Sequence, residues 1–206
     1  MSSNLVRRTF VSLIGLMLCG VGVAVFLWTG LGVDPASVFE LGIGKVFHIS
    51  YGTSAAVINV VILIVVFFID KSYINISSIL AIFGIGYTAD IVSNLLKNLN
   101  FEMSNLIVKL IFVAIGLTIM AFGIATYIRA DLGVGAIDLI SEIISEKAKL
   151  QYRVVRIVGD VSFVAIGFLL GGTFGIGTLV AAFMTGPTVQ CVRPVANKIV
   201  DTFLNR

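Results

Sequence analysis

The sequence predicts an all-α membrane protein in which six transmembrane helices form two inverted repeats of three. Three observations lead to this fold class: an extreme composition, six long apolar windows and an internal repeat. Hydrophobic residues make up 58% of the chain and charged residues only 12%, with a mean hydropathy of +1.09. These values lie outside the range of soluble domains. At 206 residues, residues 1–206 are expected to form a single membrane domain.

Six windows of about 17–25 mostly apolar residues predict the membrane spans. The windows cover residues 9–31, 53–69, 76–96, 106–128, 154–170 and 176–192. The first contains no charged residue, whereas the third contains Asp90 and the fifth contains Arg156 and Asp160. Gln190 lies near the end of the sixth window.

Two further segments, 35–50 and 136–151, follow the first and fourth windows and are too polar for ordinary spans. In the second segment, apolar residues recur at helical spacing on one face and charged residues occupy the other, which predicts an amphipathic helix. Such a helix lies in the headgroup plane, or it is a re-entrant element that lines a cavity and is shielded from lipid. The sequence favours the interfacial position.

The chain contains a repeat with a period of 101 positions. Leu31-Gly32-Val33 falls on Leu132-Gly133-Val134 without a gap between the two halves. The repeats are predicted to cover about residues 5–96 and about residues 106–197. Because each repeat has three spans, an odd number, the second copy enters the membrane from the opposite side, so the repeats are predicted to be inverted.

The basic residues predict an orientation, since Lys and Arg near span ends collect on the cytoplasmic side. With a cytoplasmic N-terminus, only Lys45, Lys97 and Lys109 of the 14 basic residues lie outside. The N-terminus and C-terminus are therefore both predicted to be cytoplasmic.

Three glycine-containing segments carry a resemblance to a known family. They are Gly30-Leu31-Gly32-Val33-Asp34-Pro35 after the first span, Tyr51-Gly52-Thr53 at the entry to the next, and Gly84-Ile85-Gly86 or Gly186-Pro187 in the third spans. The pattern resembles the YczE/YyaS/YitT family of small bacterial integral membrane proteins and covers nearly the whole chain. The resemblance implies a multi-pass protein of the bacterial cytoplasmic (inner) membrane, and it brings no set of catalytic residues.

Several function classes find no support in the sequence. Cys19 and Cys191 lie within predicted spans and His48 is the sole histidine, so neither a metal site nor a disulfide framework is expected. The chain has no Walker A sequence, no Ser-His-Asp grouping and no basic stripe for nucleic acid. We therefore expect no enzyme activity, no cofactor, no metal and no nucleic-acid partner.

Polar groups within apolar spans are functional candidates because they are costly in hydrocarbon. Asn59 and Asp160 occupy equivalent repeat positions and are predicted to face each other across a pseudo-two-fold axis, although Asp160 can also pair with Arg156 four residues earlier. Asp90 lies either in a binding site or near the outer headgroups. The full set of candidate substrate-binding residues is Asp34, Asn59, Asp90, Asp138, Asp160 and Gln190.

Interrupted helices supply a second candidate element. Asp34 is expected to cap a helix that Pro35 begins. In inverted-repeat transporters, such half-helix ends lie near the bilayer midplane, where their positive N-terminal dipoles can meet an anionic group. The predicted helix-break residues are Gly32, Pro35, Gly133 and Gly135.

The predicted function is a small-solute membrane transporter that works by alternating access between two inverted repeats, with the lipid bilayer and an unidentified solute as its partners. One alternative is a non-transporting accessory or scaffold subunit, since Gly167-x-x-x-Gly171 allows close packing in a homodimer or against a membrane partner. Another is a solute-binding subunit of a larger transporter.

Overall fold

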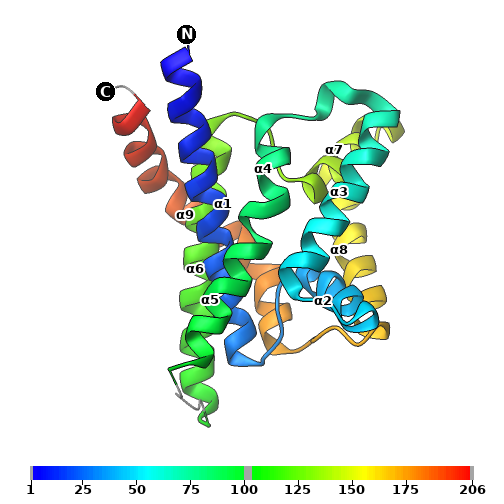
Figure 1. The fold of residues 1–206 in the computed structure, drawn as a ribbon, viewed down its shortest axis with the longest axis vertical. Coiled ribbons are helices and arrows are strands. Elements are labelled where there is room, and N and C mark those ends of the chain that lie inside the picture. Colours follow the sequence, from blue (N-terminus) through cyan, green and yellow to red (C-terminus); the bar gives the residue numbers. More distant parts are fainter. Residues whose placement is uncertain (1, 100–103, 205–206) are drawn as a thin grey trace.

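The computed structural model describes residues 2–99 and 104–204, and the regular structure in these residues is entirely helical. Figure 1 shows the arrangement of the helices. The elements are α1 (Ser2–Thr29), α2 (Pro35–Phe47), α3 (Tyr51–Asp70), the 3₁₀ turn η1 (Lys71–Tyr73), α4 (Ile76–Gly84), α5 (Gly86–Lys97), α6 (Leu106–Ala130), α7 (Ala136–Ala148), α8 (Tyr152–Leu169) and α9 (Ile176–Leu204).

Within the described residues, four helical segments are long and apolar enough to cross a membrane. They are Asn4–Thr29, Tyr51–Tyr73, Ile76–Lys97 and Leu106–Ala130. These segments confirm an all-α, multi-pass membrane protein and match the first four predicted windows. The last two predicted windows, which correspond to α8 and the start of α9, are not among the four. Helix α8 carries three charged residues, Arg153, Arg156 and Asp160, and the first part of α9 contains polar residues such as Gln190.

The two segments after α1 and α6 are helical as predicted but end earlier, at Phe47 and Ala148. Asp34 caps α2 by accepting a hydrogen bond of 3.2 Å from the Ser37 backbone N–H, and Pro35 is the first helical residue. Pro suits this position because the first backbone N–H groups of a helix have no partner within it.

Helix α2 is packed inside the bundle instead of lying free on its surface. Gly42 contacts α8 so closely that an added Cβ would lie 2.6 Å from the Gly167 carbonyl oxygen. Val38 and Glu40 are buried, and on α7 Leu139 is buried in a cluster with residues of α3. Both helices therefore have protein neighbours on their buried faces. Whether they lie in the headgroup plane or are re-entrant stays a prediction.

The predicted third and sixth spans differ from continuous straight helices. The third is divided at Ile85 into α4 and α5, where Gly20 of α1 packs against the Ile85 carbonyl oxygen. Helix α9 continues well past residue 192 to Leu204 and contains Pro187 and Pro194. Proline in a helix interior removes a hydrogen bond and bends the helix.

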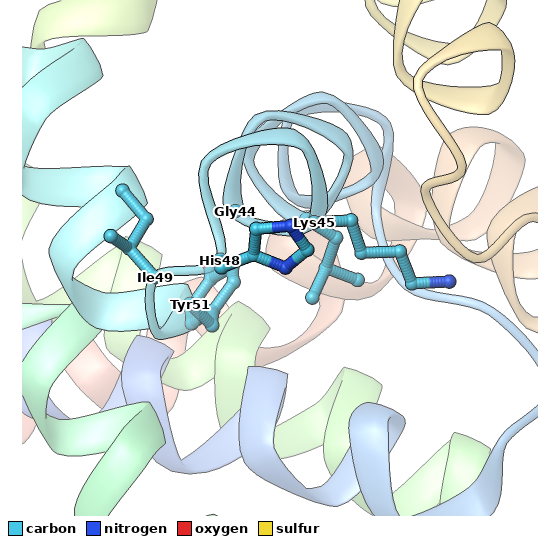
Figure 2. A pocket seen from close by; sticks show the side chains of 6 residues that line it. Gly44, Lys45, His48, Ile49 and Tyr51 are labelled. Atoms are coloured by element: carbon cyan, nitrogen blue, oxygen red, sulfur yellow. The ribbon is translucent and has the colours of Figure 1, made fainter.

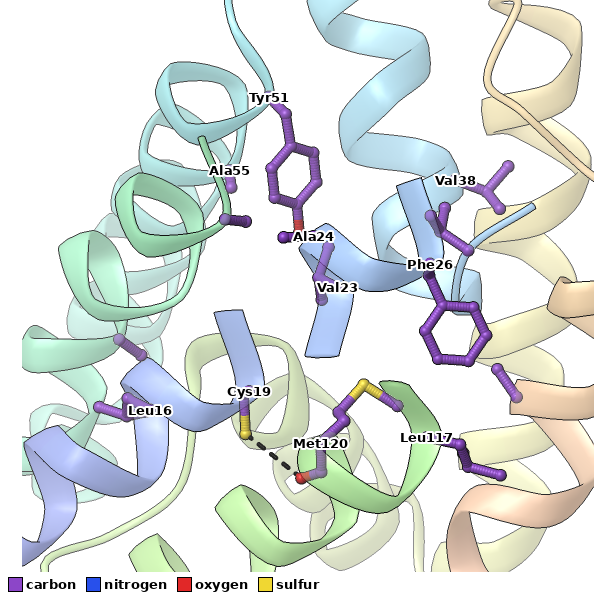
Figure 3. Close-up of a cluster of buried hydrophobic side chains, with 14 of the residues drawn as sticks. Leu16, Cys19, Val23, Ala24, Phe26, Val38, Tyr51, Ala55, Leu117 and Met120 are labelled. Atoms are coloured by element: carbon purple, nitrogen blue, oxygen red, sulfur yellow. Dashed lines mark hydrogen bonds between the residues drawn. The ribbon is translucent and has the colours of Figure 1, made fainter. Parts of the chain in front are cut away.

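Helices α1 and α6 form the centre of the core and run antiparallel (Figure 1). Gly15 of α1 lies against Gly123 of α6, and Gly22 lies against Gly116, so residue numbers rise along one helix as they fall along the other. These glycines let the two backbones approach closely. Large side chains such as Leu16, Phe26 and Leu117 fill the surrounding space (Figure 3).

Backbone geometry recurs with the same 101-residue period as the sequence. Left-handed φ values occur in three pairs separated by 101 positions: Gly30 and Asp131, Gly32 and Gly133, and His48 and Lys149. The two loops are also held alike: the Ser77 N–H donates to the Leu132 carbonyl oxygen (3.0 Å), and the Gly177 N–H donates to the Leu31 carbonyl oxygen (2.8 Å). Each repeat thus anchors the interrupted loop of the other.

The start of α1 and the end of α9 lie at the same end of the molecule (Figure 1). Arg8 forms an ion pair of 2.6 Å with Asp131, and Arg129 forms one of 2.7 Å with Asp201. These contacts join the beginning of α1 and the end of α9 to the C-terminal end of α6. Which side of the membrane this end faces stays a prediction.

Candidate functional site

A cavity of about 140 Å³ lies between α1, α2, α3, α6, α7 and α8. One wall is apolar and includes Val23, Met120 and Ile124. Its polar lining residues are Asp34, Ser37, Glu40, Tyr51, Asn59, Tyr127, Asp138 and Arg156. Polar groups gathered within an apolar membrane protein are candidates for a functional site.

Both sequence repeats supply equivalent residues to the cavity. The pairs separated by 101 positions are Cys19 and Met120, Val23 and Ile124, Asp34 and Gly135, Ala36 and Ile137, and Ser37 and Asp138. Cys19 and Met120 also touch, since the Cys19 thiol donates to the Met120 carbonyl oxygen at 3.6 Å (Figure 3). The cavity therefore lies where the two repeats meet.

On the α2 side, Asp34, Ser37, Glu40 and Tyr51 line the cavity together. Ser37 Oγ donates to Asp34 Oδ1 at 2.6 Å and lies 2.9 Å from the Tyr51 hydroxyl oxygen. Two carboxyl groups and two hydroxyl groups thus share this side of the cavity.

Glu40 is the most deeply buried carboxyl group of this site, with only 5% of its surface exposed. Burial raises its pKa to about 8, and the hydrogen bond from Tyr51 offsets only part of this effect. Burial also raises the pKa of Asp34, against the opposing effect of the hydrogen bonds from Ser37 and the charge of Arg156. Neither carboxyl group has an ion-pair partner among the described residues.

On the opposite side, Arg156 joins two carboxylates. It forms an ion pair with Asp138 of α7 and another with Asp160 of its own helix, at 3.2 Å. The Tyr127 hydroxyl of α6 donates to the second oxygen of Asp138 at 3.2 Å. The one guanidinium group in the cavity is therefore already engaged.

The structure brings together part of the predicted site. Asp34, Asn59 and Asp138 line the cavity, and Asp160 is connected to it through Arg156. Asn59 donates to the Ala55 carbonyl oxygen of its own helix at 2.8 Å. No hydrogen bond joins it to Asp160 within the described ranges, and their facing arrangement across a pseudo-two-fold axis stays a prediction.

Two predicted residues lie elsewhere. Asp90 of α5 does not line the cavity; its carboxylate lies against Gly52 at the start of α3. Gln190 is exposed on α9. The helix-break residues behave as loop elements: Gly32 and Gly133 have φ values of +99° and +92°, Pro35 begins α2, and Gly135 precedes α7 as its N-cap.

Sequence reasoning missed Glu40 and Tyr127 and gave Ser37, Tyr51 and Arg156 no binding role. Glu40 had a usable signal, since it follows Ser37 by three positions and is a carboxylate in a largely apolar helix. Tyr127 had none, because a tyrosine near the end of an apolar span is ordinary at a membrane interface.

A second, larger depression of about 430 Å³ lies at the C-terminal end of α2 (Figure 2). It is lined by Leu41, Gly44, Lys45, His48, Ile49 and Tyr51. Lys45 and His48 are exposed there. Within the described residues, no group of three or more His, Cys, Asp or Glu side chains could hold a metal ion. Tyr51 lines both this depression and the cavity.

Comparisons with known proteins find similar uncharacterized bacterial proteins, one of which is named as a membrane protein. The chain is 30% identical over 178 residues to an uncharacterized protein of Haemophilus influenzae, covering 86% of this chain and 79% of that protein. It is 24% identical to the uncharacterized protein YyaS of Bacillus subtilis, covering 90% of this chain and 92% of YyaS. It is 25% identical to the uncharacterized membrane protein YczE of the same organism, covering 98% and 92%.

These relatives confirm the resemblance to YczE and YyaS, while the likeness to YitT stays a prediction. No solved structure matches the chain. A family model matches residues 6–194, which is most of the sequence, and the chain therefore belongs to the family of unknown function DUF6198.

Proposed function

We propose that this protein is a small-solute transporter of the bacterial inner membrane. In this proposal, six transmembrane helices form two inverted repeats, α1, α3 and α4–α5 in the first and α6, α8 and α9 in the second. Helices α2 and α7 are the re-entrant elements. Both termini face the cytoplasm, and no enzymatic step is assigned.

The cavity at the junction of the repeats carries the proposal. It gathers polar side chains from both halves, including the buried Glu40 and the partly buried Asp138, although unsatisfied or charged groups in an apolar interior are costly. A protein that only packs against other subunits has no need of this space. The predicted packing motif is also engaged internally, because Gly167 contacts the backbone of Phe39.

The antiparallel arrangement of α1 and α6 supports inverted repeats, since these helices are equivalent in the sequence. The paired left-handed residues and the two exchanged loop anchors support the same relation. In transporters with inverted repeats, each repeat can adopt the packing of the other, and this exchange gives an inward-open and an outward-open state around one central site.

The two repeats differ in how their helices pack, and this difference supports a transporter with two alternating states, of which the structure represents one. Helix α3 packs on α4 and α5, whereas the equivalent helices α8 and α9 scarcely touch. If α3 moved away from α4 and α5 while α8 packed on α9, one side of the cavity would open and the other would close. Tyr51, which lies between the cavity and the depression beside His48, is the proposed gate on that side.

Cysteine labelling tests alternating access without knowledge of the solute. Cys19 and Cys191, the two native cysteines, are replaced by serine, and Ser37→Cys is introduced as the sole thiol. A membrane-impermeant maleimide is then applied to right-side-out and inside-out vesicles. A carrier predicts labelling of residue 37 from both sides, because the cavity faces each side in turn.

A His48→Cys protein in the same background is the matched control. His48 is exposed outside the cavity, so a thiol there is expected to react from one side only. If residue 37 also reacts from one side only, the alternating-access proposal is wrong. That result favours the solute-binding subunit, which presents its site to a single side.

A further inference from the structure

Glu40 differs from the other carboxyl groups of the cavity in its surroundings. It is 5% exposed, and it has no ion-pair partner among the described residues. Asp34, the second carboxyl group on this side, accepts a hydrogen bond from Ser37 and likewise has no ion pair in the described part of the chain. A carboxyl group removed from both water and cations favours its protonated form. The arrangement therefore suits one proton held at Glu40, beside Asp34.

The charge of the cavity and its surroundings is negative with or without that proton. Arg156 forms ion pairs with Asp138 and Asp160 and none with Asp34 or Glu40. Other titratable groups face Asp34 and Glu40 from neighbouring elements: Cys19 of α1, Tyr127 of α6, Asp138 of α7, and Arg156 and Asp160 of α8. Among these, only Arg156 is a cation. A positively charged occupant is therefore favoured over an anion.

Size and wall chemistry restrict the occupant further. A dry cavity of about 150 Å³ accommodates benzene, so a cavity of about 140 Å³ has room for a solute of similar size. Val23, Met120 and Ile124 offer hydrocarbon contacts on the side away from the carboxyl groups. Glu40, 5% exposed and without a cationic partner in the described part of the chain, lines the polar side.

We infer that the cavity binds a small monovalent organic cation, an alkylammonium ion with about six non-hydrogen atoms, at the carboxyl groups of Asp34 and Glu40, and that its binding releases the proton held there. One positive charge enters and one proton leaves to bulk water, so the charge of the site is unchanged. The extension to transport rests on the proposed carrier function. In that case the organic cation and the proton would cross the membrane in opposite directions.

Thermal unfolding of the detergent-purified protein tests the ligand class. The probes are cyclopentylamine, which is protonated at neutral pH, the uncharged cyclopentanol, the anion butyrate, and sodium chloride alone. Cyclopentylamine is expected to raise Tm in a concentration-dependent way, and the other three are not. An equal shift with cyclopentanol or butyrate, a shift with sodium alone, or no shift with any probe overturns the inference.

Variants assign the effect to the carboxyl pair. Glu40→Gln is expected to weaken cyclopentylamine binding by about tenfold or more, from the loss of a charged partner. Asp34→Asn serves the same purpose if the first variant does not fold. Glu142→Gln removes a carboxylate of α7 that does not line the cavity and is the matched control. Equal binding by the folded Glu40→Gln or Asp34→Asn variant and the wild type contradicts the assignment.

Proton release is measured by calorimetry in two buffers with different ionisation enthalpies. Displacement of one proton predicts that the apparent Kd falls about tenfold per pH unit below the pKa of the site, and that Glu40→Gln loses this dependence. Binding without proton release overturns the exchange. If these binding tests fail but residue 37 is labelled from both sides, the cation inference is wrong and the carrier function is retained. If the amine binds but residue 37 is labelled from one side only, the cation site is retained and the carrier function is wrong.

Discussion

At the scale of single residues, burial decides the chemistry of this protein more than residue type does. The chain has 11 acidic residues, yet Glu40 is the acidic side chain that is almost fully buried among the described residues. Its neighbours are hydroxyl groups instead of cations. The protonated form of a carboxyl group is the favoured form in such a place.

Stability is expected to fall as pH rises from about 5 to about 8. The folded-state pKa of Glu40 is raised to about 8 from an ordinary value of 4.5, so the folded state binds more protons than the unfolded state in this window. The free energy of unfolding then decreases with pH and levels off above the folded-state pKa. Thermal unfolding of wild type and Glu40→Gln across this range measures the effect. A parallel pH dependence in the two proteins contradicts it.

Gly32→Ala is expected to destabilise the protein, since Gly32 has a φ of +99° and an added Cβ would lie 2.7 Å from the Gly175 backbone nitrogen. Backbone strain of this kind costs about 1–3 kcal/mol, and the overlap adds to it. Gly159→Ala is the control, because nothing lies within 4 Å of its Cβ position. It is expected to be neutral or slightly stabilising. Similar losses of Tm in both variants would show that the left-handed turn is not required.

At the scale of helices, the close crossing of α1 and α6 determines where the cavity lies. Gly15, Gly22, Gly116 and Gly123 remove side chains from the crossing and bring the two backbones together. Cys19 and Met120, between these contacts, then line the cavity. Helices α2 and α7 complete it from either side.

Gly22→Leu is expected to force α1 and α6 apart. An added Cβ at Gly22 would lie 2.7 Å from both the Gly116 carbonyl oxygen and the Met120 Cβ. Overpacking of this kind costs about 1–3 kcal/mol or more, measured as a loss of Tm in detergent. Gly186→Leu adds the same side chain where nothing lies within 4 Å of the Cβ position. An unchanged Tm for Gly22→Leu is incompatible with the observed crossing.

At the scale of the whole molecule, equivalent positions of the two repeats are expected on opposite sides of the membrane. His48 and Lys149 are the sharpest pair, since they are 101 positions apart, both exposed, and have φ values of 54° and 53°. Single cysteines at these positions, in the background without native cysteines, are predicted to react with an impermeant maleimide from opposite sides. Labelling of both from the same side would rule out inverted repeats.

The sequence by itself determined the class of this protein, its repeat and its interrupted loops. Composition and long apolar windows reflect the cost of polar groups in lipid, which acts on every residue of a span. The period of 101 and the glycines at 32 and 133 reflect local backbone geometry, and the structure has left-handed φ values at both positions. These features are readable because they depend on residues close together in the chain.

Only the tertiary structure decided which polar groups share a site. Asp90 and Glu40 are both single carboxylates in apolar surroundings by sequence, yet Glu40 lines the cavity and Asp90 lies against α3. The amphipathic segments proved to be packed between helices because their charged faces meet other helices: Asp138 of α7 pairs with Arg156 of α8. Such pairings depend on how distant helices pack, and helical periodicity fixes the faces of a helix but not its neighbours.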